Sequence, residues 1–173
     1  MRVIIAGATG FIGRALCGAL TDAGHEVTAL ARRSVGGPRP FKTVLWNGAP
    51  GGQGGGSWAS AFEGVDAVVN LCGSPVARRW TESRKAGLLE SRVAPTRAIV
   101  EAIAAARNGP RVLINASAVG YYGDAGDADC GEDAPKGRGF LADLCADWEK
   151  AAMGAAPPPA RGGQPAPPRT AAP

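Results

Sequence analysis

The chain has 173 residues, of which 45% are hydrophobic and 20% are charged, values typical of one globular domain with a small extension. It has no apolar run long enough to span a membrane and no secretory signal, so we expect a cytoplasmic protein that binds no membrane. The net charge of +4 includes two bases in residues 153–173; the rest of the chain holds 17 bases and 15 acids, which does not indicate nucleic-acid binding.

The first 31 residues predict a strand, a helix and a second strand. Residues 3–6 form a short apolar run that ends at Gly7, and residues 26–31 form another. Residues 11–23 predict a helix because apolar side chains recur at helical spacing, and Gly24 ends it. The apolar face of this helix comprises Ile12, Leu16, Ala19, Leu20 and Ala23. Together these elements make one βαβ crossover.

The rest of the chain alternates predicted strands with predicted helices. Residues 34–57 are loop-rich, and their glycine run at 51–56 predicts a flexible surface loop, since no Lys and no helix follow it. Thr81 caps a long helix that Pro95 should interrupt or kink. The further strands are residues 43–46, 66–71 and 111–116, the helices are 81–107 and 139–152, and an acidic loop spans 124–138.

Strands that are apolar throughout and alternate with helices indicate a parallel sheet with both faces covered. We expect a Rossmann-type, three-layer α/β/α domain over residues 1–152, with five strands in the order 3-2-1-4-5. Residues 153–173 hold few large apolar groups and predict a disordered tail rich in Ala, Pro and Gly. The four cysteines match no zinc spacing, so we predict no metal site and reduced thiols.

A glycine-rich turn follows the first predicted strand and opens the first predicted helix. Its pattern is G-x-x-G-x-x-G, in which glycines permit a tight turn and let a pyrophosphate approach the backbone. The helix N-terminus adds N–H donors and a favourable dipole. The predicted cofactor-binding residues of this turn are Gly7, Thr9, Gly10, Phe11, Ile12 and Gly13. The alternative is a tight βα turn that holds no ligand.

Two arginines, Arg32 and Arg33, follow the second predicted strand. Dinucleotide sites that prefer NAD usually present an acid at this place to the ribose 2′-hydroxyl, whereas a guanidinium suits a 2′-phosphate. The sequence therefore favours NADP(H) over NAD(H). The alternative is a solvated strand end.

Several segments carry a family resemblance. They are GATGFIG at 7–13, VNLCG at 69–73, the run from RRWT to SR at 78–92, SAVGYYG at 117–123 and DWEKAA at 147–152. Residues 1–152 thereby resemble the extended short-chain dehydrogenases/reductases, and more narrowly their atypical epimerase-family oxidoreductases. This resemblance implies that Leu71, Cys72 and Gly73 end the fourth strand against the cofactor. It also implies that Arg92 reaches the phosphate or ribose side of the cofactor; the alternatives are a plain strand end and a surface arginine.

The catalytic residues of such reductases fit this chain poorly. The resemblance implies a Tyr and a Lys four residues apart on the last helix, with a Ser nearby. Counted back from Glu149, these positions hold Leu141 and Cys145, which cannot do that chemistry. The polar candidates that remain are Ser117, Tyr121 and Tyr122, of which we take Ser117 and Tyr122 as the candidate catalytic residues.

The chain also looks short for this family. A further strand and a substrate-binding part are expected after residue 152, whereas 20 of the last 23 residues are Ala, Pro, Gly or Arg. This composition favours a truncated or frameshifted end over a genuine linker. Without a sixth strand, the sheet should present an open edge through which the protein could self-associate.

The sequence thus predicts an NADP(H)-binding oxidoreductase or epimerase-like protein that acts on a small carbonyl, alcohol or sugar-nucleotide substrate. Loss of the substrate-binding part would impair this activity. The alternatives are a non-catalytic dinucleotide-sensing interaction protein, which the missing Tyr and Lys favour, and an inactive fragment.

Overall fold

The computed structural model describes residues 1–34, 41–49 and 58–154. The predicted glycine loop at 51–56 and residues 155–173 of the predicted tail lie outside these ranges. None of the helices in the described part of the chain combines the length and the apolar character that a membrane crossing requires.

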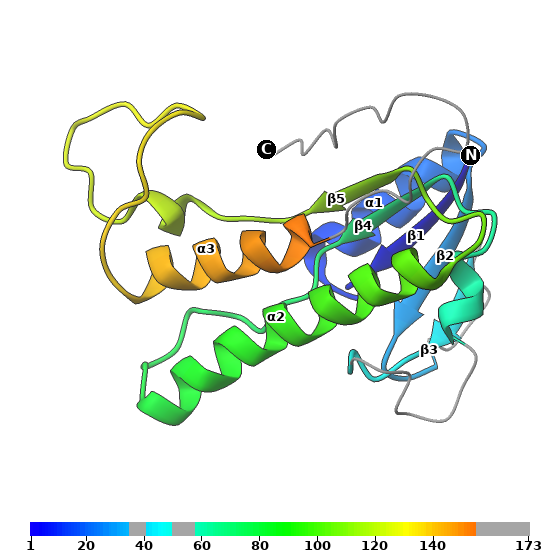
Figure 1. Cartoon of the computed structure of the whole chain (residues 1–173), viewed down its shortest axis with the longest axis horizontal. Helices are drawn as coiled ribbons and strands as arrows, with labels where there is room; N and C mark the ends of the chain where they lie inside the picture. The colour runs from blue at the N-terminus through cyan, green and yellow to red at the C-terminus, as the bar shows by residue number, and fades with distance from the viewer. Residues whose placement is uncertain (35–40, 50–57, 155–173) are drawn as a thin grey trace.

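One sheet of five parallel strands forms the centre of the molecule. The strands are β1 (Arg2–Ala6), β2 (Glu26–Ala31), β3 (Lys42–Leu45), β4 (Ala67–Asn70) and β5 (Val112–Asn115), in the order β3-β2-β1-β4-β5 (Figure 1). The predicted Rossmann-type sheet and its strand order are confirmed. Because all strands run the same way, the carboxyl ends of β1, β2 and β4 meet at one edge, where ligands bind in such sheets.

Three α-helices and two 3-10 helices connect the strands in the described ranges. They are α1 (Phe11–Asp22), η2 (Trp58–Phe62), α2 (Glu82–Ala105), η3 (Val119–Tyr122) and α3 (Phe140–Met153). Figure 1 shows α2 and α3 side by side on one face of the sheet. The first residue of the predicted tail, Met153, thus belongs to α3. The sequence did not predict either 3-10 helix, because one-turn helices leave no hydrophobic period.

The side chains of β1 alternate between two cores. Val3 and Ile5 pack with Cys17 of α1 on one face of the sheet. Ile4 packs with Ile99 of α2 on the other face. This alternation follows from the period of two along a strand, and it places α1 and α2 on opposite faces.

The buried face of α1 matches the predicted one only in part, since Leu16 and Leu20 pack against the core as predicted. Gly13 and Cys17 are its buried residues, whereas Ile12 and Ala19 of the predicted apolar face are exposed. The reason is the close approach of α1 to the turn before it, since a Cβ on Gly13 would lie 2.3 Å from the Gly7 carbonyl oxygen. The glycine must face inward, and this fixes the rotation of the helix.

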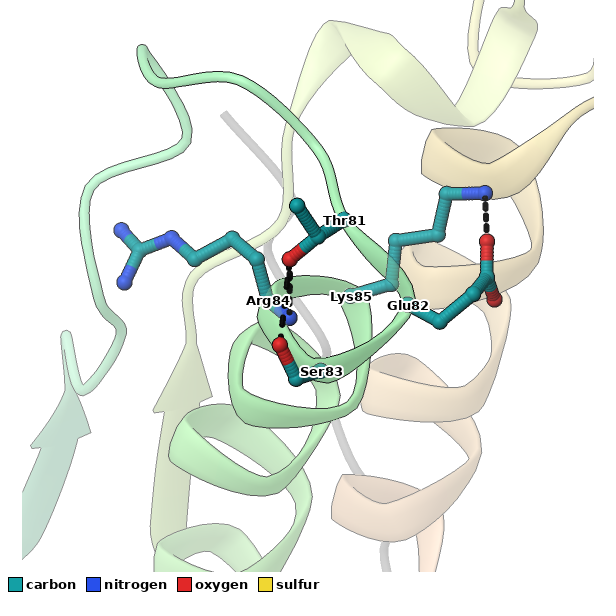
Figure 2. A network of polar contacts seen from close by, with 5 residues as sticks. All are labelled: Thr81, Glu82, Ser83, Arg84 and Lys85. Carbon is teal, nitrogen blue, oxygen red and sulfur yellow. Dashed lines mark hydrogen bonds and ion pairs between the residues drawn. The ribbon is translucent and has the colours of Figure 1, made fainter.

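The long helix α2 begins where the sequence predicts and continues through Pro95. Its N-cap is Thr81, whose hydroxyl accepts the backbone N–H of Arg84 at 3.2 Å (Figure 2). The interruption expected at Pro95 is absent. A proline removes one backbone hydrogen bond, but the next residue, Thr96, is anchored to the sheet by a 2.8 Å hydrogen bond from Asn70. Tertiary contacts therefore hold the helix together at this point.

The outer strand β5 leaves apolar surface uncovered. Val112 is 39% exposed and Ile114 is 38% exposed, although Ile114 lies in register with Val69, which is buried in the core beside α1. Among the described residues, no strand pairs with the outer side of β5. The predicted open edge of the sheet is thus present in the described part of the chain.

Candidate functional site

The turn between β1 and α1 has the geometry of a phosphate cradle. Gly7 has a φ of +82°, which favours glycine, and its carbonyl accepts the N–H of Gly10 at 3.0 Å. Gly10 is the N-cap of α1 and contributes no side chain to the helix end. The Nε of Arg14 donates to the Thr9 carbonyl at 2.9 Å and ties the turn to the helix.

The glycines of this turn lie where other atoms come very close. A Cβ on Gly7 would lie 2.7 Å from the Leu71 carbonyl oxygen, and one on Gly13 would lie 2.3 Å from the Gly7 carbonyl oxygen. At Gly10, the nearest atom to such a Cβ is the Gly7 carbonyl oxygen at 3.3 Å. The fold itself therefore requires Gly7 and Gly13, whereas Gly10 leaves room above the turn.

The N-terminus of α1 is suited to an anion. It has no side-chain cap and no acid in its first turn, so its first N–H groups and the helix dipole are available to a phosphate. Phe11 is 95% exposed and Ile12 is 64% exposed, and Thr9 and Gly10 are exposed beside them. The residues present fit the diphosphate of a dinucleotide cofactor.

Arg32 and Arg33 follow the end of β2 and are exposed at the same edge of the sheet. Burial raises the pKa of the Cys72 thiol to about 12, and the positive charge of Arg32 opposes this with a smaller effect. In the sheet β1 lies between β2 and β4, so the turn after β1, Arg32 after β2 and Cys72 after β4 share one edge.

The backbone after β4 lies against the glycine turn. β4 ends at Asn70, so Leu71, Cys72 and Gly73 begin the following loop instead of ending the strand as predicted. The N–H of Leu71 donates to the Ala6 carbonyl at 2.9 Å, and the N–H of Cys72 donates to Asn70 Oδ1 at 3.2 Å. These bonds hold the loop beside Gly7, where a Cβ on that glycine would meet the backbone of Leu71 and Cys72.

Arg92 is half-buried and faces the same loop. Its guanidinium donates to the Leu88 carbonyl at 3.0 Å and to the Ser74 carbonyl at 3.1 Å. It also lies over the Trp148 ring, 5.2 Å from the ring centroid. A Cβ on Gly73 would lie 3.0 Å from the guanidinium carbon. Arg92 is therefore a half-buried residue next to the predicted cofactor contacts, and its contact with the cofactor stays a prediction.

The two candidate catalytic hydroxyl groups have different partners. Ser117 donates a short hydrogen bond to Glu149 Oε1 on α3. The Tyr122 hydroxyl donates to the Gly131 carbonyl in the acidic loop at 3.2 Å, and the Tyr122 ring packs edge-on against Tyr121. The structure thus brings Ser117 together with a carboxylate and directs Tyr122 toward the loop.

The two positions where the family resemblance implies Tyr and Lys are filled by packing residues. Leu141 packs against η3, because a Cβ added to Gly120 would lie only 3.0 Å from the Leu141 Cβ. Cys145 is buried, and its thiol donates to the Ala118 carbonyl at 3.7 Å. Burial and the neighbouring Glu149 carboxylate raise the pKa of Cys145. Neither side chain can replace the hydroxyl of a Tyr or the charge of a Lys.

A buried polar network that the sequence did not predict supports this edge of the sheet. Asn70 Nδ2 donates to Asn115 Oδ1 at 2.6 Å and to Thr96 Oγ1 at 2.8 Å. Trp148 Nε1 also donates to Thr96 Oγ1, at 3.0 Å. The network joins β4, β5, α2 and α3 directly behind the loop that holds Cys72. Its signal in the sequence is an asparagine at the end of each of two apolar strands.

Comparison of the chain with known proteins gives consistent results. Residues 3–139 match the model of the NAD dependent epimerase/dehydratase family. An epimerase family protein of Mycobacterium tuberculosis is 45% identical over 150 residues, which are 86% of this chain and 47% of that protein. The chain therefore spans about half the length of the curated relatives that it matches.

Solved structures agree with these relatives. The crystal structure of human epimerase family protein SDR39U1 (isoform 2) with NADPH is 34% identical, with a TM-score of 0.73 over 88% of this chain and 48% of that one. The nucleoside-diphosphate sugar epimerase from Corynebacterium glutamicum is 36% identical, with a TM-score of 0.71 over 90% of this chain and 31% of that one.

Proposed function

Because the chain belongs to the NAD-dependent epimerase/dehydratase family, we propose that it binds NADP(H) at the edge of the sheet where β1 ends. The observation that carries this proposal is the turn at Gly7, Gly10 and Gly13, which opens onto an uncapped helix N-terminus. The diphosphate would accept hydrogen bonds from the first N–H groups of α1. Phe11 and Ile12, both exposed, would then lie along the cofactor.

The choice of NADP(H) over NAD(H) rests on Arg32 and Arg33. Both guanidinium groups are exposed just after β2, where a ribose 2′-phosphate would be placed relative to the turn. Among the described residues, neither arginine has an ion-pair partner. The NADPH in the human SDR39U1 structure supports the same preference.

When bound, the cofactor supplies or accepts a hydride at the carbon of a small carbonyl, alcohol or sugar-nucleotide substrate. The protein itself would have to donate or accept the proton at the substrate oxygen. Ser117 is the better placed of the two candidates, because Glu149 accepts its hydrogen bond and could accept its proton. Tyr122 would have to release the Gly131 carbonyl before it could act.

A second candidate function is dinucleotide binding without catalysis. The observation that favours it is the pair Leu141 and Cys145, which cannot replace the Tyr and Lys of related reductases. In this case the protein would respond to the ratio or the amount of NADP(H) through an interaction with another protein. A chain without any activity is the third alternative.

The test combines cofactor titration with an activity screen. Isothermal calorimetry should show NADPH binding at least tenfold tighter than NADH binding, as expected when one charged contact is lost. NADPH oxidation over a panel of aldehydes, ketones and sugar nucleotides then separates the alternatives. Turnover with any substrate supports the oxidoreductase, binding without turnover supports the sensing protein, and absence of binding contradicts both.

A further inference from the structure

The buried polar side chains in the described part of the chain are those of Asn70, Thr96 and Asn115, and all three belong to one hydrogen-bonded network. Thr96 lies at its centre. Its hydroxyl oxygen is fully buried and accepts hydrogen bonds from Asn70 Nδ2 at 2.8 Å and from Trp148 Nε1 at 3.0 Å. The hydroxyl donates its own hydrogen to the Arg92 carbonyl at 2.6 Å. Three elements, β4, α2 and α3, thus meet at one oxygen atom.

The hydrogen bonds of this network have only one possible direction. A hydroxyl has one hydrogen to donate, and Thr96 donates it to a carbonyl, so Asn70 and Trp148 must both donate to Thr96. The amide of Asn70 therefore has its nitrogen toward Thr96 and its oxygen toward the N–H of Cys72, which donates to it at 3.2 Å. The second hydrogen of this amide goes to Asn115 Oδ1 at 2.6 Å. Thr96 thereby fixes the acceptor that holds the loop after β4.

Stability alone does not account for such a network. A buried polar group is unfavourable unless its hydrogen bonds are made, and apolar side chains of the same shape can give equal stability. A fully paired network instead selects one arrangement of the elements that it joins, because any shift leaves a buried donor without an acceptor. The network around Thr96 therefore fixes the relative positions of β4, β5, α2 and α3.

The network reaches both residues of the candidate proton-transfer pair, Ser117 and Glu149. Trp148 directly precedes Glu149 on α3, and the last residue of β5, Asn115, comes two residues before Ser117. Thr96 is bonded to Trp148 directly and to Asn115 through one intervening amide. Its helix, α2, lies beside α3 on one face of the sheet (Figure 1). The serine and the carboxylate are thus carried by two segments that one network holds together.

We propose that Thr96 is a positioning residue that couples the loop after β4 to the Ser117–Glu149 pair. This assignment rests on the proposed function, because it takes that loop as a contact of the cofactor and that pair as the groups that move a proton. A cofactor at the glycine turn would contact the loop and alter the hydrogen bond of Cys72. The change reaches α3 because the hydrogen bonds of a network polarise one another. The bound cofactor and the aligned pair therefore stabilise each other, by the same free energy in both directions.

The first experiment follows the indole N–H of Trp148 by two-dimensional nitrogen–proton NMR spectroscopy while NADPH is added. This resonance is the one that Trp148→Phe removes. Saturation with NADPH should shift it in the unchanged protein and in Thr96→Ser, which keeps the hydroxyl, but not in Thr96→Val, which lacks the acceptor. Ile99→Val is the matched control, since Ile99 is buried in the apolar core on the same helix, and the shift should persist there. Calorimetry gives the NADPH concentration that saturates each variant.

The second experiment tests the positioning without cofactor, by crystal structures of the same variants. The hydrogen bond from Ser117 to Glu149 should be lost in Thr96→Val and present in Thr96→Ser and in Ile99→Val. Thermal unfolding shows whether each variant folds. If Thr96→Val does not fold, Trp148→Phe removes the bond to Thr96 from the side of α3 and should break the same contact.

The outcomes separate this proposal from the proposed function. A Trp148 resonance that does not respond to bound NADPH in the unchanged protein would overturn the coupling, and so would an equal shift in Thr96→Val. A Ser117–Glu149 contact that persists in Thr96→Val would overturn the positioning role. If NADPH does not bind the unchanged protein, the proposed function fails and the coupling fails with it, whereas the crystal structures still decide whether Thr96 positions the pair.

Discussion

Gly10 and Gly13 lie three residues apart in one turn but serve different purposes. A Cβ on Gly13 would overlap the backbone of Gly7 and Ala8, whereas a Cβ on Gly10 would have only the Gly7 carbonyl oxygen near it, at 3.3 Å. The φ of Gly10 is −74°, which any residue can adopt. At the residue scale, Gly13 is therefore required for folding and Gly10 for access to the helix N-terminus.

The substitution Gly10→Val should abolish NADPH binding and preserve the fold. Its branched side chain would stand where the diphosphate must approach the backbone. Calorimetry measures the binding, and circular dichroism checks the fold. Gly18→Ala is the matched control, because a Cβ added to this glycine of α1 would have no atom within 4 Å. Unchanged NADPH affinity of Gly10→Val would mean that the turn holds no phosphate.

The substitution Arg32→Asp should weaken NADPH binding by about tenfold to a hundredfold and leave NADH binding nearly unchanged. The reason is that the new carboxylate would repel the 2′-phosphate, which NADH lacks, and could accept a hydrogen bond from the ribose hydroxyl. Fluorescence titration with both cofactors measures the ratio of their affinities. An equal loss for both cofactors would contradict a role of Arg32 in 2′-phosphate recognition.

At the scale of the element, the N-termini of α1 and α2 differ in their caps and in the charge of their first turns. α2 is capped by the Thr81 hydroxyl and carries Glu82 in its first turn. α1 has a glycine N-cap and no acid in its first turn. Caps and acids satisfy the free N–H groups and the positive end of a helix. The helix that lacks both features is the one where the diphosphate is predicted, so its first N–H groups are available to a ligand.

The substitution Thr81→Ala should lower the free energy of unfolding by about 1 kcal/mol, the usual effect of losing an N-cap. The lost interaction is the 3.2 Å bond from the Arg84 N–H (Figure 2). Urea denaturation measures the change, and Thr81→Ser, which keeps the hydroxyl, should remain close to the unchanged protein. A stability of Thr81→Ala equal to that of Thr81→Ser would show that the cap contributes nothing.

The sequence predicted the strands better than the helix faces. Apolar runs bounded by glycine identify buried parallel strands directly, and the order of the five strands followed from the βαβ pattern. The face of α1 was predicted only in part: Leu16 and Leu20 pack against the core, but a hydrophobic pattern does not mark Gly13, whose buried position depends on its small size. The continuity of α2 through Pro95 depends on the bond between Asn70 and Thr96, which joins distant parts of the chain and leaves no local signal.

The candidate site was predictable in its backbone part and less so in its side chains. The glycine turn and the arginines after β2 carry local patterns, and the structure places them at one edge of the sheet. The pairing of Ser117 with Glu149 joins residues 32 positions apart, and the network around Asn70 joins four elements. Such contacts arise only from the packing of α2 and α3, so no local pattern in the sequence predicts them.

At the scale of the whole molecule, the main feature is the difference between the two outer strands. β3 has Lys42 at its start, paired with Glu26 of β2 at 2.7 Å; lysine is a residue that discourages the pairing of sheet edges between molecules. β5 carries Val112 and Ile114 half-exposed, and among the described residues nothing pairs with its outer side. The β5 edge is therefore the part of the sheet most open to a second copy of the chain.

We expect the protein to self-associate through β5 and the substitution Ile114→Lys to weaken this association by at least about tenfold, because a charge at an open edge opposes strand pairing. Light scattering over a range of concentrations measures the association. Val119→Lys is the matched control, since Val119 is 85% exposed but lies on η3. NADPH affinity should stay constant in both variants, because the glycine turn and Arg32 follow β1 and β2, on the far side of β4 from this edge. If the unchanged protein is a stable monomer at all concentrations, or if Ile114→Lys associates as strongly as Val119→Lys, the β5 edge is not an interface.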